Sequence, residues 1–374
     1  MSLAAATSPK PGTQALRVVV LDDDPVFRTF LSQMLSRIGL DVVAQCSSIE
    51  AARKRLAQGG VDAVTVDVVL KGESGLDFLK WCHQAHRSII TVLVTAGSER
   101  GARTGVDAVF LGAAALLTKP DSRSITGFET ELRRVFADGR RAPARPAAGV
   151  TVAVRPVNPV TSAPGRPAPT KSALAPARRT ELLAIGASTG GPPVLLKLLK
   201  GLPQSFDVPI VITQHMPALH IPYMTELLAA QSGRKVNVAA EGQVLMRGHA
   251  YVAVGKHLTV ARSGDRLSLK YVDGAPEHFC KPAVDPMFRS VAEVCRGNAL
   301  GVVLTGMGAD GAKGAVALRA SGNPVIIQDA ETSVVWGMPG SVHALGAADG
   351  VFHVDRIPAA IQEWMGFSPR GGTR

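Results

Sequence analysis

The stretch Leu182-Leu183-Ala184-Ile185-Gly186-Ala187-Ser188-Thr189-Gly190-Gly191 joins a short apolar run to a glycine-rich turn that contains a serine. Apolar side chains at helical spacing follow this turn, at Val194, Leu195, Leu198 and Leu199. This order predicts a strand, a tight turn and a helix, the repeating unit of an open α/β sheet. Ser188 would then lie at a helix N-terminus, where free N–H groups and the helix dipole favour the negative charge of an acyl-transfer oxyanion.

Two further apolar runs end in loops that contain possible partners for a serine nucleophile. The run 208–213 leads to His215, and the run 299–304 leads to a glycine-rich loop that contains Asp310. Open parallel sheets place their sites at the carboxyl ends of the strands. We therefore expect Ser188, His215 and Asp310 to meet at one sheet edge and to form a catalytic triad.

The identity of the acid stays open from the residues alone. Asp285 and Asp329 also lie near the ends of predicted elements. Asp310 is favoured because its strand is the most apolar of this half and its loop is the richest in glycine. Residues 186–190 match G-x-S-x-G, but the α/β-hydrolase order is Ser, Asp, His, whereas this chain runs Ser, His, Asp, so an ordinary esterase of that fold is disfavoured.

A dinucleotide-binding oxidoreductase is the main alternative. Residues 306–311 match the G-x-G-x-x-G fingerprint, with an apolar run before them and a helical pattern after them. The fingerprint leaves Ser188 and His215 unexplained. It also places the carboxylate of Asp310 where a pyrophosphate would lie on the helix N-terminus, and that charge opposes phosphate binding.

Composition indicates a soluble globular protein of two domains. The chain has 374 residues, of which 46% are hydrophobic and 19% charged. Eight basic and no acidic residues lie in 139–180, so this proline-rich segment accounts for most of the net charge of +11 and is interpreted as a linker. We predict one domain over 15–138 and a second over 181–366.

Each predicted strand of the first domain ends in a polar residue. The apolar runs are 16–21, 61–66, 89–94 and 113–118. The polar residues that follow them are Asp22, Asp23, Asp67, Thr95 and Lys119. Three carboxylates at one sheet edge repel one another unless a cation joins them, and their hard oxygen ligands suit Mg²⁺. An acidic side chain there could attack a phosphoryl group whose oxygens the lysine and the hydroxyl bind.

Residues 16 to about 137 resemble the receiver domain of two-component response regulators. The resemblance implies a flavodoxin-like, doubly wound parallel sheet in which Asp67 is the phosphoacceptor. Asp22 and Asp23, together with Asp67, are the implied Mg²⁺ ligands, and Thr95 and Lys119 the implied phosphoryl-binding groups. It also implies a sensor histidine kinase as partner.

The second domain resembles chemotaxis protein-glutamate methylesterases, the CheB family. The motifs that carry the resemblance are 186–191, 214–217, 305–311 and 337–339. It implies a second doubly wound α/β domain that hydrolyses γ-glutamyl methyl esters on the cytoplasmic helices of a chemoreceptor and releases methanol. Deamidation of receptor glutamines is the related second activity.

The residue types of this domain give a mechanism. His215 would take the proton of Ser188, Asp310 would hold the imidazole tautomer, and backbone N–H groups near Thr189 and Met307 would bind the oxyanion, with no cofactor in the esterase site. By the family's example, the receiver docks over the triad, and phosphorylation weakens this docking.

A response regulator with a non-catalytic output is the third class considered. A DNA-binding helix-turn-helix output would be small and basic, whereas 181–366 is large and modestly charged, so no nucleic-acid partner is expected. No segment resembles a signal peptide or is long enough to span a bilayer, so we expect a cytoplasmic protein without membrane insertion. The cysteines lack metal-ligand spacing and close pairing, which favours reduced thiols.

Overall fold

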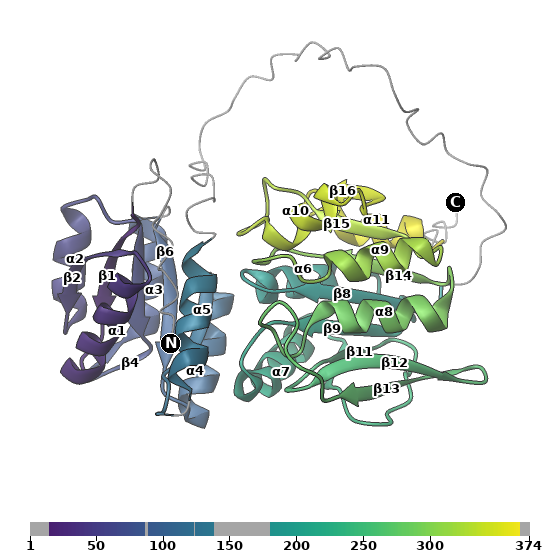
Figure 1. Cartoon of the computed structure of the whole chain (residues 1–374), viewed down its shortest axis with the longest axis horizontal. Helices are drawn as coiled ribbons and strands as arrows, with labels where there is room; N and C mark the ends of the chain where they lie inside the picture. Colours follow the sequence, from purple (N-terminus) through teal and green to yellow (C-terminus); the bar gives the residue numbers. More distant parts are fainter. Residues whose placement is uncertain (1–14, 87–88, 123, 138–179, 367–374) are drawn as a thin grey trace, which may run out of the picture.

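The computed structural model describes residues 15–86, 89–122, 124–137 and 180–366. Two α/β units, each built on its own parallel sheet, lie side by side (Figure 1). Apart from Thr180, the predicted linker over 139–180 lies outside the described residues. Within the described part of the chain, no helix is long and apolar enough to cross a membrane.

The first unit is a five-stranded parallel sheet with the strand order β2-β1-β3-β6-β7. Its strands are β1 (Arg17–Leu21), β2 (Asp41–Cys46), β3 (Ala63–Asp67), β6 (Ile90–Thr95) and β7 (Ala115–Thr118). Its helices are α1 (Pro25–Arg37), α2 (Ile49–Ala57), α3 (Gly75–Ala85), α4 (Glu99–Phe110) and α5 (Ile125–Ala137). A two-residue ladder joins β4 (Val69–Leu70) to β5 (Glu73–Ser74). This is the predicted flavodoxin-like order, in which ligands bind at the carboxyl ends of the strands.

Helices cover both faces of this sheet. Side chains of α1 and α5 share one buried cluster with the strands, and side chains of α2, α3 and α4 share another. The start of α1 shows how the sequence sets an element. The carboxylate of Asp24 accepts the N–H of Val26 at 2.9 Å, and Pro25 occupies the first turn, where its missing N–H costs nothing.

The second unit is a seven-stranded parallel sheet with the order β10-β11-β9-β8-β14-β15-β16. Its strands are β8 (Leu182–Ala187), β9 (Ile210–Gln214), β10 (Lys235–Val238), β11 (His249–Val252), β14 (Ala299–Val303), β15 (Val325–Gln328) and β16 (Gly350–Phe352). Its helices are α6 (Gly191–Gly201), η1 (Ala218–His220), α7 (Ile221–Ser232), α8 (Val284–Cys295), α9 (Ala312–Ala320), α10 (Gly337–Ala344) and α11 (Ile357–Trp364). The central strands β8, β9 and β14 are buried throughout, and most of their residues are apolar, as expected for strands covered on both faces.

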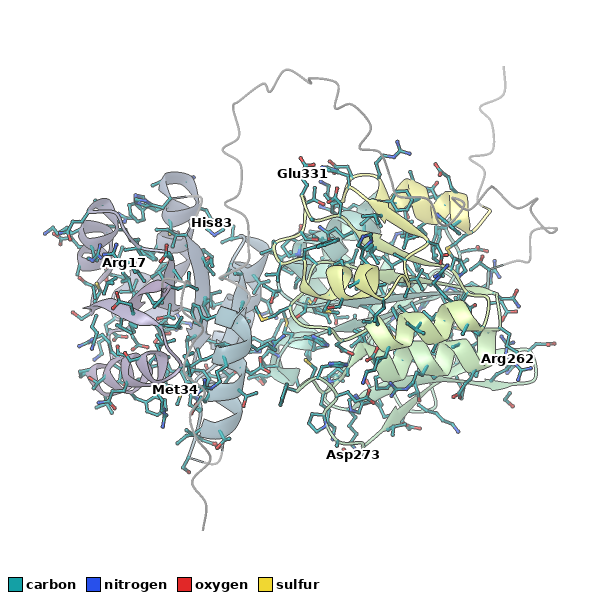
Figure 2. The ribbon with its side chains drawn as sticks, turned by 45° about the horizontal axis from the view of Figure 1, so that its top comes forward. Arg17, Met34, His83, Arg262, Asp273 and Glu331 are labelled. Carbon is teal, nitrogen blue, oxygen red and sulfur yellow. The ribbon has the colours of Figure 1, made fainter. Side chains whose placement is uncertain are left out.

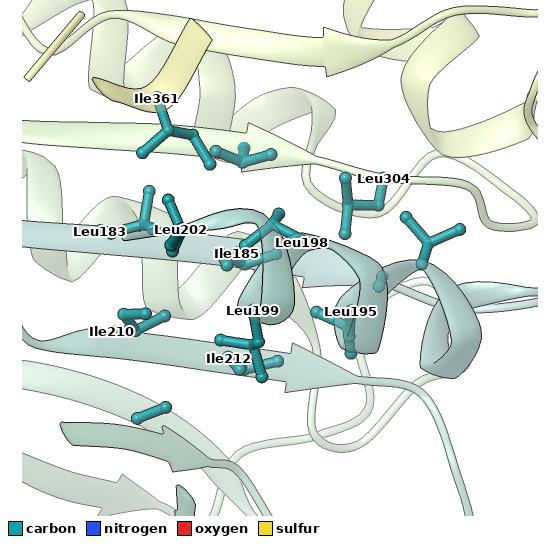
Figure 3. Close-up of a cluster of buried hydrophobic side chains, with 14 of the residues drawn as sticks. Leu183, Ile185, Leu195, Leu198, Leu199, Leu202, Ile210, Ile212, Leu304 and Ile361 are labelled. Atoms are coloured by element: carbon teal, nitrogen blue, oxygen red, sulfur yellow. The ribbon is translucent and has the colours of Figure 1, made fainter. Parts of the chain in front are cut away.

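Two buried clusters pack against opposite faces of this sheet, as a doubly wound fold requires. One contains side chains of α6, α7 and α11, and Figure 3 shows Leu195, Leu198 and Leu199 of α6 beside Ile185 and Ile212 of the strands. The other contains side chains of α8, α9 and α10.

An antiparallel hairpin, which the sequence analysis did not predict, joins the second cluster. Its strands are β12 (His257–Ser263) and β13 (Arg266–Val272). Its inward side chains, including Leu258 and Leu269, are buried against the sheet and α8. The hairpin leads into the segment 273–283, which precedes α8 and borders the site described next.

Candidate active site

Ser188 lies in the tight turn between β8 and α6, as the sequence predicts. Its N–H donates to the carbonyl of Thr305 at 3.1 Å, and its own carbonyl accepts the N–H of Gly191 at 2.8 Å. Gly190 has a φ of 74°, in the left-handed region that favours glycine. A Cβ at Gly306 would lie 2.7 Å from the Cβ of Ser188, so both glycines are needed for the turn to close against its neighbour.

His215 and Asp310 meet at the carboxyl edge of the sheet. Nε2 of His215 lies 2.7 Å from Oδ2 of Asp310, and both side chains are almost fully buried. The carboxylate also accepts the N–H groups of Val284 and Asp285, at 2.6 and 3.0 Å, in the first turn of α8. Burial raises the pKa of Asp310, but its bonds to His215 and to these N–H groups outweigh burial and hold the pKa below its usual value. The acid is therefore ionised and fixed in position.

The two other candidate acids have different partners. Asp285 accepts from Gly314 N–H at 2.6 Å and pairs with His278 at 3.0 Å. Asp329 bonds Thr332 in the turn after β15. Among the residues described, neither carboxylate is hydrogen-bonded to His215, so the geometry favours Asp310 as its partner.

Gln214 links the turn that contains Ser188 to the turn that contains His215. Its side-chain Nε2 donates to the carbonyl of Ser188 at 2.8 Å and to that of His215 at 3.0 Å. Its backbone neighbour His215 also donates its N–H to the carbonyl of Ala187 at 3.0 Å. Gln214 belongs to the motif 214–217, but nothing in the sequence alone assigned it this bracing role.

The serine and the histidine are not bonded to each other. Oγ of Ser188 accepts a hydrogen bond from Nη1 of Arg134 at 3.1 Å, and Nδ1 of His215 faces Sγ of Cys280 at 3.5 Å. No hydrogen bond in the described part of the chain joins Ser188 to His215. Burial lowers the pKa of His215, but its contacts with Cys280 and Asp310 outweigh burial and raise the pKa to about 9. A raised pKa disfavours the neutral imidazole that a general base needs.

Arg134 comes from α5 of the first unit. It also pairs with Glu131, one helical turn earlier, at 2.7 Å. Figure 1 shows α4 and α5 on the side of the first unit that faces the second. Residues from both units, including Arg134 and Ser188, line one cavity of about 510 Å³. Ser188 is only 2% exposed, and Arg134 of the first unit contacts its hydroxyl.

Helix α4 extends the contact between the units. Val106 packs into the buried cluster that contains α6 and α7. Arg103 pairs with Glu226 of α7 at 3.2 Å and lies 5.2 Å from the ring centre of Tyr223. The interface therefore combines an apolar contact with an exposed ion pair, on the same side of the first unit as Arg134.

Of the two amide groups expected to bind an oxyanion, that of Thr189 is next to Ser188 in the chain, and that of Met307 lies in the neighbouring loop after β14. Thr189 follows Ser188 and is buried, and Met307 is buried in the loop after β14. Within the described residues, no hydrogen bond uses the N–H of Thr189 or of Met307. An oxyanion hole requires such unused N–H groups, aimed at the position of the oxyanion.

The polar residues of the first unit also converge at its carboxyl edge. Nζ of Lys119 lies 2.8 Å from Asp22 and 2.6 Å from Asp67. All three side chains are buried or nearly so. Burial raises the pKa of Asp22 more than its pairing with Lys119 lowers it. The removal of this carboxylate from water therefore costs energy that the pairing offsets only in part.

The donors of this edge fit a divalent cation. Carboxylate oxygens of Asp22, Asp23 and Asp67 lie within 4.8 Å of one another, and an all-oxygen set of this kind suits Mg²⁺. Thr95 is fully buried, and its hydroxyl is 3.5 Å from the carbonyl of Ala96. Among the described residues it has no hydrogen bond to Asp67, so the structure places it on the correct strand without bringing it to the acceptor.

Each unit of the chain is similar to a known protein family. The family model for CheB methylesterase matches residues 183–361, and the model for the response regulator receiver domain matches residues 18–126. The chain is 37% identical to protein-glutamate methylesterase/protein-glutamine glutaminase 2 of Xanthomonas oryzae pv. oryzae, over 91% of this chain and 95% of that protein. It is 36% identical to a protein of the same name, numbered 1, from Paramagnetospirillum magneticum, over 96% and 98% of the two chains. The crystal structure of the Thermotoga maritima CheB methylesterase catalytic domain covers 50% of this chain and 98% of its own, with 34% identity and a TM-score of 0.48.

Proposed function

This chain belongs to the protein-glutamate methylesterase/protein-glutamine glutaminase family, with a response regulator receiver domain, and we propose that its esterase uses Ser188, His215 and Asp310. The substrate is a glutamate γ-methyl ester, and the products are glutamate and methanol. The observation that carries the assignment is the 2.7 Å contact between His215 and Asp310, beside the serine turn that Gln214 braces.

The resting contacts must rearrange before reaction. Asp310 holds Nε2 of His215, so Nδ1 is the nitrogen left for the nucleophile. Ser188 has to exchange its bond to Arg134 for one to Nδ1, and Nδ1 has to exchange Cys280 for Ser188. Once neutral, His215 takes the hydroxyl proton as Oγ attacks the ester carbonyl, and Asp310 stabilises the imidazolium that forms.

The remaining steps follow from the same groups. The N–H groups of Thr189 and Met307 bind the oxyanion of the tetrahedral intermediate. His215 returns its proton to the departing methoxide, so that methanol leaves and a glutamyl ester of Ser188 remains. Water, activated by His215, then hydrolyses this ester. The same attack on a glutamine side chain would release ammonia and account for glutaminase activity.

Regulation is assigned to the receiver domain. Asp67 is proposed as the phosphoacceptor, with Lys119 and Thr95 binding the phosphoryl oxygens. Mg²⁺ held by Asp22, Asp23 and Asp67 would neutralise charge on the phosphoryl group during transfer. Phosphorylation breaks the existing pairing of Lys119 with Asp67, and this change should weaken the packing of α5 over Ser188.

The partners and the location are also proposals. The substrate class points to methylated glutamates on the cytoplasmic helices of a chemoreceptor, which would place the chain in the cytoplasm. The receiver domain points to a sensor histidine kinase of the chemotaxis type as phosphodonor. The oxidoreductase and DNA-binding alternatives are not favoured, because Asp310 of the glycine loop is bonded to His215 and family membership covers both units.

Replacement of the nucleophile tests the esterase assignment. In the full chain, Ser188→Ala should lower kcat for methanol release from methylated receptor membranes by roughly 10⁴-fold or more. Ser321→Ala, at the C-terminal end of α9, serves as the matched control and should retain full activity. Turnover near the wild-type rate in a folded Ser188→Ala protein would show that the nucleophile is a different residue.

A further inference from the structure

The segment 273–283, between β13 and α8, carries an aromatic side chain into solvent beside the active site. Phe279 is 77% exposed, and its φ of 62° lies in the left-handed region. His278 before it also has a left-handed φ, of 50°. Such a backbone costs a bulky residue energy and persists only where surrounding contacts enforce it, commonly at functional sites.

Contacts on both sides of Phe279 enforce this conformation. Glu277 and Cys280 exchange two backbone hydrogen bonds, at 3.1 and 2.8 Å. The carboxylate of Glu277 pairs with Arg289 of α8 through two bonds, at 2.5 and 3.0 Å. Lys281 pairs with Asp273, which Figure 2 labels at the start of the segment. The chain is therefore fixed around a phenyl ring that itself remains exposed.

Phe279 lies at the entrance to the esterase site. It lines the same cavity as Ser188 and His215, and its neighbour Cys280 touches His215. The ring of Phe279 remains exposed while Arg134 of α5 contacts Ser188. We call Phe279 and its neighbours at the cavity entrance the rim, and this rim is available to a substrate before and after the receiver moves. Leu219 of η1, near His215 in the chain, is also partly exposed.

The size of the substrate determines what meets this rim. An α-helix with its side chains is about 10–12 Å across, whereas the reacting ester belongs to a single side chain of that helix. The helix must then rest outside while the ester reaches Ser188. Residues three or four positions from the glutamate lie on the same helix face, about 5–6 Å away, and these meet the rim.

We propose that Phe279 is a substrate-binding residue, which packs against an apolar side chain three or four positions from the methylated glutamate on the receptor helix. This inference rests on the proposed function, because it takes a helical glutamyl ester as the substrate. The preferred substrate is therefore an amphipathic helix with an apolar residue beside the ester. Exposed aromatic rings commonly anchor contacts of this kind.

Steady-state kinetics of the full chain, activated by acetyl phosphate and Mg²⁺, test the proposal on methylated receptor membranes. Phe279→Ala should raise KM roughly tenfold with kcat within about twofold of wild type, and Phe279→Leu should recover most of the loss. Leu345→Ala, which removes an exposed apolar side chain outside the cavity lining, is the control and should leave KM unchanged. An unchanged KM in Phe279→Ala overturns the proposal.

Thermal unfolding separates a binding role from a structural one. Phe279→Gly relieves the left-handed strain, so it should unfold at a temperature no lower than wild type while its KM rises as in Phe279→Ala. A fall in unfolding temperature in both variants would instead make Phe279 a structural residue.

A binding measurement keeps this inference distinct from the esterase assignment. Co-sedimentation with receptor membranes in the Ser188→Ala background requires no turnover, and Phe279→Ala should weaken it to the same extent as it raises KM. Retained binding in that background overturns the proposal, even if the triad is assigned correctly.

Discussion

The two sites of this protein lie at equivalent places, the carboxyl edges of two parallel sheets, yet their resting states differ. In the receiver, Lys119 already contacts both Asp22 and Asp67, within 2.8 Å. In the esterase, His215 and Asp310 are joined, but Ser188 is bonded to Arg134 and Nδ1 of His215 faces Cys280. In the first site the charged groups are already in contact, although among the described residues Thr95 is not hydrogen-bonded to Asp67. In the second site, within the same described residues, the serine is not hydrogen-bonded to the histidine.

The difference follows from what holds each set of residues. Opposite charges in a buried site attract strongly enough to meet without a ligand. A neutral hydroxyl and an imidazole gain only a modest hydrogen bond, and a nearby guanidinium competes well for the hydroxyl. An arginine on the first unit can therefore hold the serine, whereas the aspartate–histidine pair remains intact. Each prediction below alters one side of this contrast.

Loss of the fixed pair should have the largest effect. Asp310→Asn should lower kcat by about 10⁴-fold near neutral pH while the protein remains folded, because the amide favours the wrong imidazole tautomer. Methanol release measures the loss. Asp329→Asn is the matched control, since the carboxylate of Asp329 bonds Thr332 in the turn after β15, and an equal loss in that variant would contradict the assignment of the acid.

Loss of Arg134 should have a smaller effect, and it should raise the activity rather than lower it. Arg134→Ala should raise the activity of the unphosphorylated full chain by about 3–10-fold, because one hydrogen bond between a charged and a neutral group no longer holds Ser188. The activity after acetyl phosphate should stay near wild type. Arg133→Ala, which removes the neighbouring arginine paired with Glu129, is the control. If Arg134→Ala and Arg133→Ala had the same basal rate, Arg134 would have no specific role in inhibition.

The raised pKa of His215 predicts a change in stability with pH. The pKa rises from an ordinary 6.5 to about 9 on folding, so the stabilisation is complete below pH 6.5 and is lost as pH rises through 9. The unfolding temperatures of wild type and His215→Asn should therefore converge between pH 6.5 and 9. A gap in unfolding temperature that widens over this range would contradict a raised pKa of His215. His353→Asn, at an exposed histidine, serves as the control.

Much of the fold follows from local sequence patterns. Apolar runs followed by polar or glycine-rich turns predicted the strands that carry Asp67, Ser188, His215 and Asp310, because buried parallel strands need continuous apolar residues. The hairpin of β12 and β13 was missed, although its alternating side chains and the Gly264-Asp265 turn carry a signal.

The partners of the site residues were harder to predict. Arg134 occupies an outward position of an amphipathic helix, and nothing local distinguishes it from Arg133, because its contact belongs to another domain. Cys280 was interpreted only as a reduced thiol. Its contact with His215 depends on the segment after β13, whose conformation is set by ion pairs distant in the sequence. Such contacts depend on how two folded units dock, and they leave no periodic pattern in the sequence.

The most direct test of the account follows methanol release from methylated receptor membranes by one sample of the full chain, before and after addition of acetyl phosphate with Mg²⁺. The account predicts a slow rate that rises on addition, and no rise in Asp67→Ala, while Asp77→Ala, at an exposed carboxylate on α3, responds as wild type. A wild-type rate that does not change on addition, or a rise that persists in Asp67→Ala, would contradict control of Ser188 by the receiver.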